Sequence, residues 1–445
     1  MFRAVDPWAG RRLHFVGIGG AGMSGLALVA HALGAGVTGS DRAAGSPYAG
    51  SLRALGIEPR TGHDGANVPD GADVVVSSAI PPENPERAAA RERGLRELHR
   101  ADLLGELTRL RPTIAVTGTH GKTTTSSMLV HALRACGMDP GYLVGSNVRS
   151  TGKNAGWGTG KWLVVEADES DRSLLKLAPA IAVLTNAELD HHTTYASQRD
   201  VDETFRAFLA LADRAAVVWD RPHLLALAPD GLELVPFDAA PVLTPGGSRF
   251  TLDGVEVELT VPGTHNALNA AAALGAARLT GADLAAAAAA LRDFQGAGRR
   301  FERLGATPEG AEVVDDYAHH PTEVAAALEA ARTLAHRRLI AIFQPHLYSR
   351  TARQATEFGA ALAGADEVVV LDVYAARERR EDFPGVSGLL VAQAAADAGA
   401  GRRVAWLPTF AQAEALVRAR LRPGDLVMTL GAGDVDTLGR SLVER

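Results

Sequence analysis

The chain has little of what marks secreted, membrane-spanning or nucleic-acid-binding proteins. One cysteine, Cys136, occurs in 445 residues, which excludes an intramolecular disulfide framework and favours a reducing compartment. No uncharged apolar run reaches the ~18 residues of a membrane helix, and Met1–Gly20 has no apolar segment of signal-peptide type. A formal net charge of -7 argues against a broad basic surface for nucleic acid. We therefore expect a cytoplasmic protein without membrane or nucleic-acid partners, with Cys136 as a small core side chain rather than a nucleophile.

What the chain does have is length and apolar material for several cores, since 445 residues exceed what one hydrophobic core usually serves and 47% are hydrophobic. Short Val/Ile/Leu runs alternate with longer helical patterns, which predicts an α/β fold with mainly parallel sheets. Three blocks are visible, with boundaries at residues 1–109, 110–296 and 297–445. The expected strands include Leu13–Val16, Val37–Gly39, Asp73–Ser77, Thr113–Val116, Trp162–Val165, Ile181–Leu184, Val255–Leu259, Glu312–Val314, Leu339–Phe343, Glu367–Leu371 and Leu426–Leu430.

A glycine-rich loop lies between the expected strand Thr113–Val116 and an expected helix at Thr123–Ala135. It has the form Gly118-x-x-Gly121-Lys122-Thr123, shorter than the strict Walker pattern. Successive N–H groups of such a loop and the start of the helix attract an anion. Lys122 can then reach the outer phosphates and the Thr123 hydroxyl can bind magnesium. An ordinary strand-to-helix turn is the structural alternative, and we predict phosphate binding.

A second glycine loop, Gly17-x-Gly19-x-x-Gly22, follows the first strand, with Asp41 about twenty residues further on. This spacing is typical of a loop that binds a diphosphate over a helix start, with the carboxylate near a ribose. NAD and a UDP-sugar both fit, and a tight structural turn is the alternative. Two phosphate loops in one chain indicate two nucleotides, which a simple dehydrogenase does not need.

Polar clusters follow two strands of the second block. Glu166–Asp171 comes after Trp162–Val165, and Thr185–His192 comes after Ile181–Leu184. The carboxyl ends of parallel strands share one edge, so these clusters are expected to converge on the phosphate loop. Oxygen ligands there suit magnesium, while His191 could coordinate a second ion or orient a carboxylate. A solvated acidic loop is the alternative.

The third block carries Asp315–Pro321 and Gln344–Arg350 after apolar strands, which we interpret as a second-substrate face. Arg299 and Arg300, in the preceding linker, could close onto phosphate or could be solvated linker arginines.

The order of these motifs resembles the Mur ligases over essentially the whole chain. The resembling stretches are His14–Gly25, Ser40-Asp41, Val116–Thr125, Glu166–Asp171, Val261–Asn266, Gly298–Glu302, Asp315–Pro321 and Phe343–His346. The resemblance implies three α/β domains, each on a mainly parallel sheet: a Rossmann-like UDP-sugar-binding domain (1–109), a P-loop ATPase-like central domain (110–296) and a Rossmann-like C-terminal amino-acid domain (297–445). It also implies ATP-dependent attachment of L-alanine to the lactyl carboxylate of UDP-N-acetylmuramate through an acyl phosphate, for peptidoglycan precursor synthesis. The alternative is a sibling recycling ligase that attaches a whole peptide.

The same resemblance implies site residues. The ATP site would comprise Gly118, Thr119, His120, Gly121, Lys122, Thr123, Thr124, His265 and Asn266. The UDP-sugar site would comprise Gly17, Gly19, Gly20, Gly22, Met23, Ser24, Asp41, His63 and Ser77. Magnesium would be held by Thr123, Glu166 and His191, and the catalytic residues would be Lys122, His191, His319 and Arg350. The expected partners are ATP, UDP-N-acetylmuramate and L-alanine, in a monomer or homodimer.

The chain departs from the family pattern at two places. Several sibling ligases carry a carbamylated lysine shortly after the histidine, whereas Val201–Asp220 contains no lysine, so that role does not transfer. Leu347 stands where some members have a basic residue that would contact the amino-acid carboxylate.

Two other classes of protein fit the motifs less well. A dehydrogenase would leave the Gly118–Thr123 loop without a role, and a non-catalytic nucleotide sensor would leave the third block without one.

Overall fold

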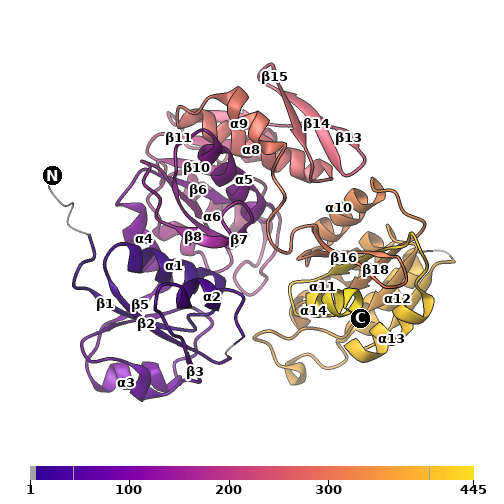
Figure 1. Ribbon diagram of the computed structural model, residues 1–445, viewed down its shortest axis with the longest axis horizontal. Coiled ribbons are helices and arrows are strands. Elements are labelled where there is room, and N and C mark those ends of the chain that lie inside the picture. Colours follow the sequence, from indigo (N-terminus) through magenta and orange to yellow (C-terminus); the bar gives the residue numbers. More distant parts are fainter. Residues whose placement is uncertain (1–6, 44, 400, 445) are drawn as a thin grey trace. The chain divides into compact units, whose positions relative to one another are not determined.

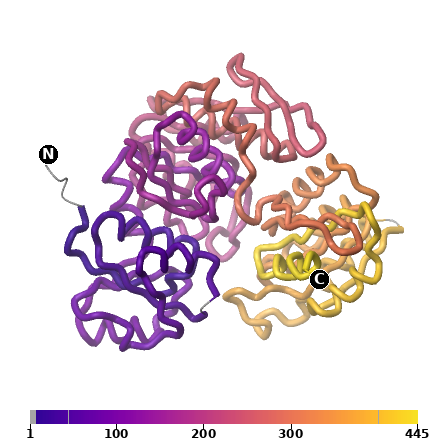
Figure 2. Tube along the Cα trace, in the orientation of Figure 1, coloured from indigo at the N-terminus to yellow at the C-terminus, as the bar shows by residue number. Residues whose placement is uncertain are grey.

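The computed structural model describes residues 7–43, 45–399 and 401–444. Residues 1–6, with which the predicted first domain begins, lie outside the described residues. The chain forms two compact units: one contains the residues up to Glu188 with Gln198–Asp238 and Ala270–Ala290, and the other contains Leu189–Ser197, Ala239–Asn269 and the chain from Leu291 onward. Figure 1 labels the elements of both units and Figure 2 traces their Cα path. The domain boundaries at 109/110 and 296/297 stay predictions.

The N-terminal part of the first unit is a parallel five-stranded sheet with the order β3-β2-β1-β4-β5. Its strands are β1 (Arg12–Val16), β2 (Gly36–Asp41), β3 (Arg60–Thr61), β4 (Asp73–Val76) and β5 (Glu97–His99), and its helices are α1 (Ala21–Ala32), α2 (Ala49–Arg53), α3 (Pro85–Glu92) and α4 (Arg100–Thr108), with a 3-10 turn η1 at Gly65–Asn67. The strand order reverses between β1 and β4, and such a switch point is where doubly wound sheets bind ligands.

The rest of the first unit is built on a seven-stranded sheet with the order β12-β11-β10-β6-β9-β7-β8, parallel except for the β7–β8 pair. The strands are β6 (Thr113–Thr117), β7 (Gly141–Val148), β8 (Lys153–Gly156), β9 (Leu163–Glu166), β10 (Ile181–Leu184), β11 (Ala215–Trp219) and β12 (Glu233–Phe237). The helices of this region are α5 (Lys122–Ala135), α6 (Gln198–Leu209), α7 (Pro222–Leu225), α8 (Thr264–Leu279) and α9 (Leu284–Leu291), with η2 at Ser173–Lys176. Of α8 and α9, only the residues within Ala270–Ala290 belong to the first unit. Because β6 pairs in parallel with β9 and β10, the phosphate loop and both polar clusters begin at the carboxyl ends of three neighbouring strands.

The second unit contains two sheets. Three antiparallel strands, β13 (Val242–Thr244), β14 (Gly247–Leu252) and β15 (Val255–Leu259), form the smaller one. The larger has the order β16-β17-β21-β18-β19-β20 and is parallel except at β16. Its strands are β16 (Glu302–Ala306), β17 (Glu312–Asp316), β18 (Leu339–Phe343), β19 (Glu367–Val370), β20 (Arg403–Trp406) and β21 (Leu426–Leu430); its helices are α10 (Pro321–Arg332), α11 (Tyr348–Leu362), α12 (Gly388–Ala398), α13 (Phe410–Arg420) and α14 (Val435–Val443), with η3 at Arg380–Asp382.

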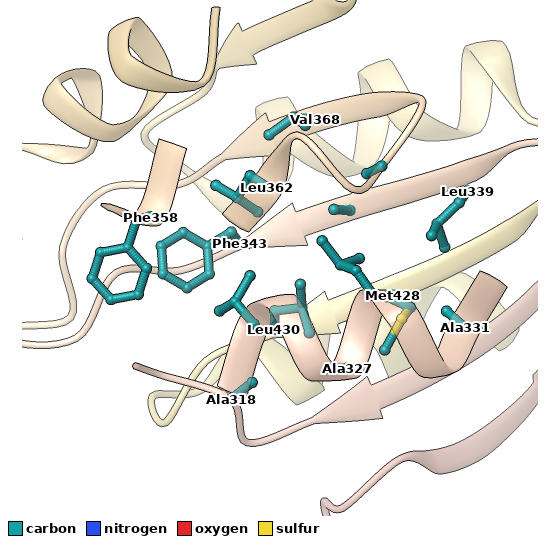
Figure 3. Packing of buried hydrophobic residues seen from close by; sticks show 14 of the residues in the cluster. Ala318, Ala327, Ala331, Leu339, Phe343, Phe358, Leu362, Val368, Met428 and Leu430 are labelled. Atoms are coloured by element: carbon teal, nitrogen blue, oxygen red, sulfur yellow. The ribbon is translucent and has the colours of Figure 1, made fainter. Parts of the chain in front are cut away.

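Strand β18 shows why this larger sheet needs helices on both faces. Its five residues are all buried, and alternate side chains enter different cores. Leu339 and Phe343 pack with α10, α11 and α12 in one core, shown in Figure 3. Ile340 and Ile342 pack with α13 and α14 in the other. A continuous apolar strand of this kind is typical of a parallel sheet covered twice, and the predicted α/β class is confirmed.

Two expectations about single features have definite outcomes. In the described part of the chain, no helix combines the length and the apolar character needed to cross a bilayer.

The interpretation of Cys136 as a core side chain is wrong, because the residue is half-buried and ends helix α5. Partial burial and the nearby Asp283 raise the pKa of the Cys136 thiol, so the thiol stays protonated and is a poor nucleophile.

Candidate functional site

The phosphate loop connects the buried strand β6 to helix α5, and two glycines shape it. Gly121 precedes the helix with φ +81°, and Gly118 has φ +137°. A Cβ on Gly118 would overlap Thr185 Oγ1 and would lie 3.0 Å from the backbone nitrogen and oxygen of Asn186. Position 118 therefore requires glycine for both its backbone conformation and its close packing.

The segment after β10 holds this loop in shape. The Thr185 hydroxyl donates to the His120 carbonyl at 2.6 Å, and the His120 N–H donates to Asn186 Oδ1 at 2.8 Å. The Glu188 N–H donates to Thr119 Oγ1 at 2.8 Å. The polar cluster predicted at the end of β10 thus supports the loop backbone, which keeps the loop's conformation ready for an anion.

Lys122 lies in the loop but points at protein acceptors. Its ammonium donates to the carbonyls of Gly118 at 2.7 Å and Thr119 at 3.0 Å, and it lies 2.8 Å from the carboxylate of Glu169, which is 2% exposed. Burial alone would lower the pKa of Lys122, but the Glu169 charge outweighs it and raises the pKa above its usual range. The lysine is therefore charged, and its part in phosphate binding stays a prediction.

Oxygen atoms suited to magnesium lie beside the loop. The Thr123 hydroxyl donates to Glu166 Oε1 at 2.9 Å, and Glu166 Oε2 accepts the Gly145 N–H at 2.7 Å. A hydroxyl and a carboxylate next to a phosphate loop match the ligands that magnesium takes in phosphoryl-transfer sites. Two of the three predicted metal ligands are thus in contact, while His191 belongs to the second compact unit and its part in the site stays a prediction.

The first glycine loop opens at the switch point of the five-stranded sheet. The N–H groups of Gly17 and Ile18 donate to the Ser40 carbonyl at 2.8 and 2.9 Å. The Gly19 N–H donates to Asp41 Oδ2 at 2.8 Å, and a Cβ on Gly19 would lie only 2.8 Å from that oxygen. The predicted ribose carboxylate therefore lies directly against the predicted diphosphate loop.

The other residues predicted for the UDP-sugar site lie around this loop in different ways. Gly20 precedes α1, and Met23 and Ser24 are buried in its first turns, where the Ser24 N–H donates to the Gly20 carbonyl at 2.8 Å. Ser77 directly follows β4. His63 follows β3, with Nδ1 3.0 Å from Ser40 Oγ.

Arg100, which was not predicted as a site residue, links the first glycine loop to the acidic run Glu166–Asp171. Its Nη2 donates to Asp168 at 2.8 Å and to Asp171 at 3.1 Å, and its Nη1 would be 3.4 Å from a Cβ on Gly22. Burial alone would lower the pKa of Arg100, but Asp168 and Asp171 raise it. The acidic run thus contacts the phosphate loop through Glu166 and Glu169, and the first glycine loop's neighbourhood through Arg100.

Replacing Arg100 with alanine is expected to cost on the order of 1–3 kcal/mol of stability, since two partly buried carboxylates would lose a charged donor. The matched control is Lys176→Ala, which removes the ion pair of Lys176 with Asp102 at 2.6 Å between the same two segments. That pair is exposed on both sides, so its loss should cost about 0–1 kcal/mol. Denaturant unfolding of both variants measures the difference, and equal costs would contradict a special role for Arg100.

The second unit places Arg350 in a buried ion pair. Its guanidinium, 2% exposed, makes two hydrogen bonds of 2.8 and 2.9 Å from Nη2 to the Asp190 carboxylate, and Nη1 donates to His346 Nδ1 at 3.1 Å. Burial would raise the pKa of Asp190, but Arg350 holds it well below its usual range. Arg350 is thus fixed by Asp190 and in turn orients His346. Both partners lie in the polar clusters predicted after β10 and β18, but neither was predicted as a site residue. His191, the next residue, has φ +50° and its Nε2 lies 3.7 Å from Asp190.

His319 and His265, also in the second unit, are neutral near pH 7. Burial lowers the pKa of each to about 4. Nδ1 of His319 lies 2.9 Å from the Tyr317 carbonyl, so this nitrogen carries the proton and Nε2 is left as an acceptor. Asn266, predicted beside the adenine, donates from Nδ2 to the Pro262 carbonyl at 2.7 Å, which fixes the first turn of α8.

Three family models match successive parts of the chain: the Mur ligase family catalytic domain at residues 12–111, the Mur ligase middle domain at 116–277 and the Mur ligase glutamate ligase domain at 299–433. The UDP-N-acetylmuramate–L-alanine ligase of Kineococcus radiotolerans is 47% identical, covering 96% of this chain and 94% of that protein. The ligase of the same name from Mycolicibacterium gilvum is 43% identical, covering 97% and 96%. The chain belongs to the Mur ligase family.

Solved Mur ligase structures share the fold over nearly the whole chain. The UDP-N-acetylmuramate–alanine ligase of Thermotoga maritima has a TM-score of 0.82 at 29% identity, with 98% of both chains covered. A murein peptide ligase from Psychrobacter arcticus has a TM-score of 0.72 at 25% identity, covering 97% of this chain and 98% of that one. Both glycine loops of this Mur ligase fall within the matched regions, and the predicted three-domain α/β class is confirmed.

The interpretation of Arg299, the first linker arginine of this Mur ligase, as a solvated side chain is wrong, while its closing onto phosphate stays a prediction. Its Nε donates to the buried Asp315 at 3.0 Å, and its Nη1 and Nη2 donate to the carbonyls of Gly433 and Gly431 at 2.7 and 2.8 Å. With all these donors engaged, Arg299 anchors the linker to the larger sheet of the second unit. Arg300 has a looser pairing, 3.7 Å from Glu323.

Proposed function

We propose that this Mur ligase joins L-alanine to the lactyl carboxylate of UDP-N-acetylmuramate at the expense of ATP, as a step in peptidoglycan precursor synthesis. The observation that carries the proposal is the 43–47% identity over nearly the full chain to ligases named for this reaction. Two glycine loops of phosphate-binding type support it, one in contact with the acidic run and the other linked to that run through Arg100, because the reaction needs ATP and a second, diphosphate-bearing substrate.

The chemistry begins with the carboxylate, which is too unreactive to be attacked by an amine. A lactyl carboxylate oxygen takes the γ-phosphoryl group of ATP, giving an acyl phosphate and ADP. The neutral amine of alanine then attacks the acyl carbon, and the tetrahedral intermediate expels phosphate as the amide forms. The amine nitrogen loses one proton to a base in this step.

In this proposal the residues of the chain act mainly by positioning and charge. The backbone of Gly118–Thr124 and the ammonium of Lys122 hold the ATP phosphates, with His265 and Asn266 at the adenine. Thr123, Glu166 and His191 would hold Mg²⁺, which supplies positive charge to the phosphate oxygens. Gly17–Ser24, Asp41, His63 and Ser77 hold the UDP-sugar.

The two histidines proposed near the reacting ends have different tasks. A pKa of about 4 makes His319 a weak base, so its unprotonated Nε2 suits accepting a hydrogen bond from the incoming amine. His191 is proposed to act at the metal, and a histidine whose lone pair holds Mg²⁺ cannot also receive the amine proton. Arg350, whose charge is balanced by Asp190, places His346 beside His319; the two rings are 5.8 Å apart.

The second candidate is a recycling ligase that attaches a whole peptide to the same acceptor. The likeness to the Psychrobacter murein peptide ligase favours it, although that structure agrees less well with the chain than the Thermotoga alanine ligase does. The proposed setting for either activity is the cytoplasm, with the enzyme as a monomer or homodimer.

Phosphate release from ATP tests the proposal. The purified chain is given UDP-N-acetylmuramate together with L-alanine, glycine, L-serine or the L-alanyl-D-glutamyl-diaminopimelate tripeptide, and each substrate is also omitted in turn. Release that needs both the sugar nucleotide and L-alanine is the expected result. Release with the tripeptide but not with L-alanine would favour the recycling activity, and release indifferent to the sugar nucleotide would refute both.

A further inference from the structure

A carboxylate with no solvent exposure lies beside the C-terminal part of strand β2 in the five-stranded sheet. Glu86, in the first turn of α3, is fully buried. Its Oε2 accepts the Ser40 hydroxyl proton at 2.6 Å, and its Oε1 accepts from Asn67 Nδ2 at 2.8 Å. Burial alone would raise the pKa of Glu86, but its interactions with His14, Ser40 and Asn67 lower it to about 2. Glu86 is therefore ionised and can only accept hydrogen bonds.

The hydrogen-bond count around Ser40 assigns the tautomer of His63. A hydroxyl has one proton to donate, and that of Ser40 goes to Glu86. The 3.0 Å contact between Ser40 Oγ and His63 Nδ1 must then be a bond in which Nδ1–H donates to the hydroxyl oxygen. The 3.6 Å distance from His63 Nδ1 to Glu86 Oε2 favours the same proton position. A neutral His63 consequently carries an unprotonated Nε2.

The position of His63 makes its Nε2 accessible to a ligand. The ring is partly exposed, at 18% of the side chain, and within the described part of the chain its Nε2 makes no hydrogen bond. His63 follows β3, and Ser40 lies in β2 and accepts through its carbonyl the N–H groups of the first glycine loop. In doubly wound sheets the nucleoside lies beyond the ends of these strands when the diphosphate is on that loop.

We propose that Glu86 and Ser40 are positioning residues that lock His63 in its Nδ1–H tautomer, so that Nε2 accepts a hydrogen bond from the nucleoside half of the sugar nucleotide. The inference rests on the proposed UDP-sugar function of this part of the first unit. The ligand group must be a donor, and a uridine nucleotide offers two kinds: the ribose hydroxyls and the imide N–H of uracil. Either one is recognised by the same lone pair.

A purely structural role for Glu86 is the competing explanation, since the carboxylate also ties down the segment around Asn67. That role would be served equally by either tautomer of His63. It also predicts that all donors to Glu86 are equivalent in their effect on ligand binding. The two accounts therefore differ in what happens when single donors are removed.

The first test is the tautomer itself, measured by ¹⁵N NMR of the full-length protein labelled at histidine, at a pH where His63 is neutral. The expected result is an unprotonated Nε2 in the unmodified chain, with a mixture of tautomers in Ser40→Ala and Glu86→Gln. An Nε2–H form of His63 in the unmodified protein would overturn the proposal regardless of any ligand.

The second test compares the binding of UDP with that of 2′-deoxy-UDP, 3′-deoxy-UDP and N3-methyl-UDP. In the unmodified chain, the analogue that lacks the donor received by His63 should bind about tenfold more weakly, which corresponds to one hydrogen bond. In Ser40→Ala, UDP itself should weaken and the difference between UDP and that analogue should disappear, while ATP affinity stays unchanged. Which analogue shows the effect identifies the donor.

Asn67→Ala is the control, because it removes another hydrogen bond to Glu86 and no contact of the His63 ring; it also removes the 3.1 Å bond from Asn67 Nδ2 to the Gly62 carbonyl. It should leave the tenfold discrimination intact. Equal loss of discrimination in Asn67→Ala and Ser40→Ala would mean that Glu86 acts only on the fold. If the unmodified chain does not bind UDP, the proposed function fails and the ligand part of this inference fails with it, whereas the NMR result still decides the tautomer.

Discussion

Replacing Lys122 with alanine should lower ATP-dependent turnover by on the order of 10²-fold or more. The ammonium is held in the loop by the carbonyls of Gly118 and Thr119 and by Glu169, so in the proposed ATP complex it needs only to change partners. Alanine removes the positive charge that opposes the charge developing on the transferred phosphoryl group. The rate of phosphate release at saturating substrates measures the loss.

Two companion variants separate catalysis from stability at this position. Lys153→Ala makes the same substitution at an exposed residue of the first unit and should leave turnover unchanged. Lys122→Ala also leaves Glu169 as a buried charge without its ammonium partner, which destabilises the fold. The double variant Lys122→Ala/Glu169→Ala should recover stability but not turnover. Near-normal phosphate release from the single variant would remove the loop from the mechanism.

Gly118→Ala should abolish nucleotide binding and reduce turnover by at least about 10²-fold. The added methyl group would overlap Thr185 Oγ1 and press on the backbone of Asn186, and the backbone φ of +137° is one that side chains rarely allow. The loop must therefore move away from the segment that shapes it. Nucleotide binding by calorimetry and the thermal midpoint of unfolding are the measurements.

Gly137→Ala is the control for this substitution. Gly137 follows α5 in the same unit, has φ +74°, and has nothing within 4 Å of the position where a Cβ would be. Only backbone strain of about 1 kcal/mol is expected there, without loss of nucleotide binding. If both variants lost nucleotide binding equally, general destabilisation rather than the loop's close packing would be the cause.

The parts of the fold that could be predicted are those with a strong local signal. Strands β18 and β21 have the predicted bounds, Leu339–Phe343 and Leu426–Leu430, because each is a continuous apolar run. The two-residue strand β3 (Arg60–Thr61) is exposed and exists through its pairing with β2, so no local pattern marks it. Strand β16 was missed for a similar reason, since its residues are mostly half-buried.

The site residues divide in the same way, into those with a local sequence signal and those identified only by partners far away in the chain. The glycine loops could be read from spacing, because glycine and lysine at those positions have a direct chemical reason. Arg100 and Asp190 could not, since their partners are 68 and 160 residues away in the chain. Glu86 carries no local sequence signal, and only its burial against Ser40 distinguishes it.

The acidic run Glu166–Asp171 has a consequence for the coupling between the binding affinities of the two nucleotides. Within this run, Glu169 neutralises Lys122 of the phosphate loop. Asp168 and Asp171 neutralise Arg100, which lies beside the first glycine loop. In the proposed ATP complex the triphosphate takes over Lys122, and the Glu169 carboxylate exchanges its ammonium partner for an anionic neighbour, a few residues from the carboxylates that Arg100 binds. Anion occupancy on one side thereby alters the electrostatic potential on the other, so the affinities of the two nucleotides should be thermodynamically linked, each changing the other's by the same factor.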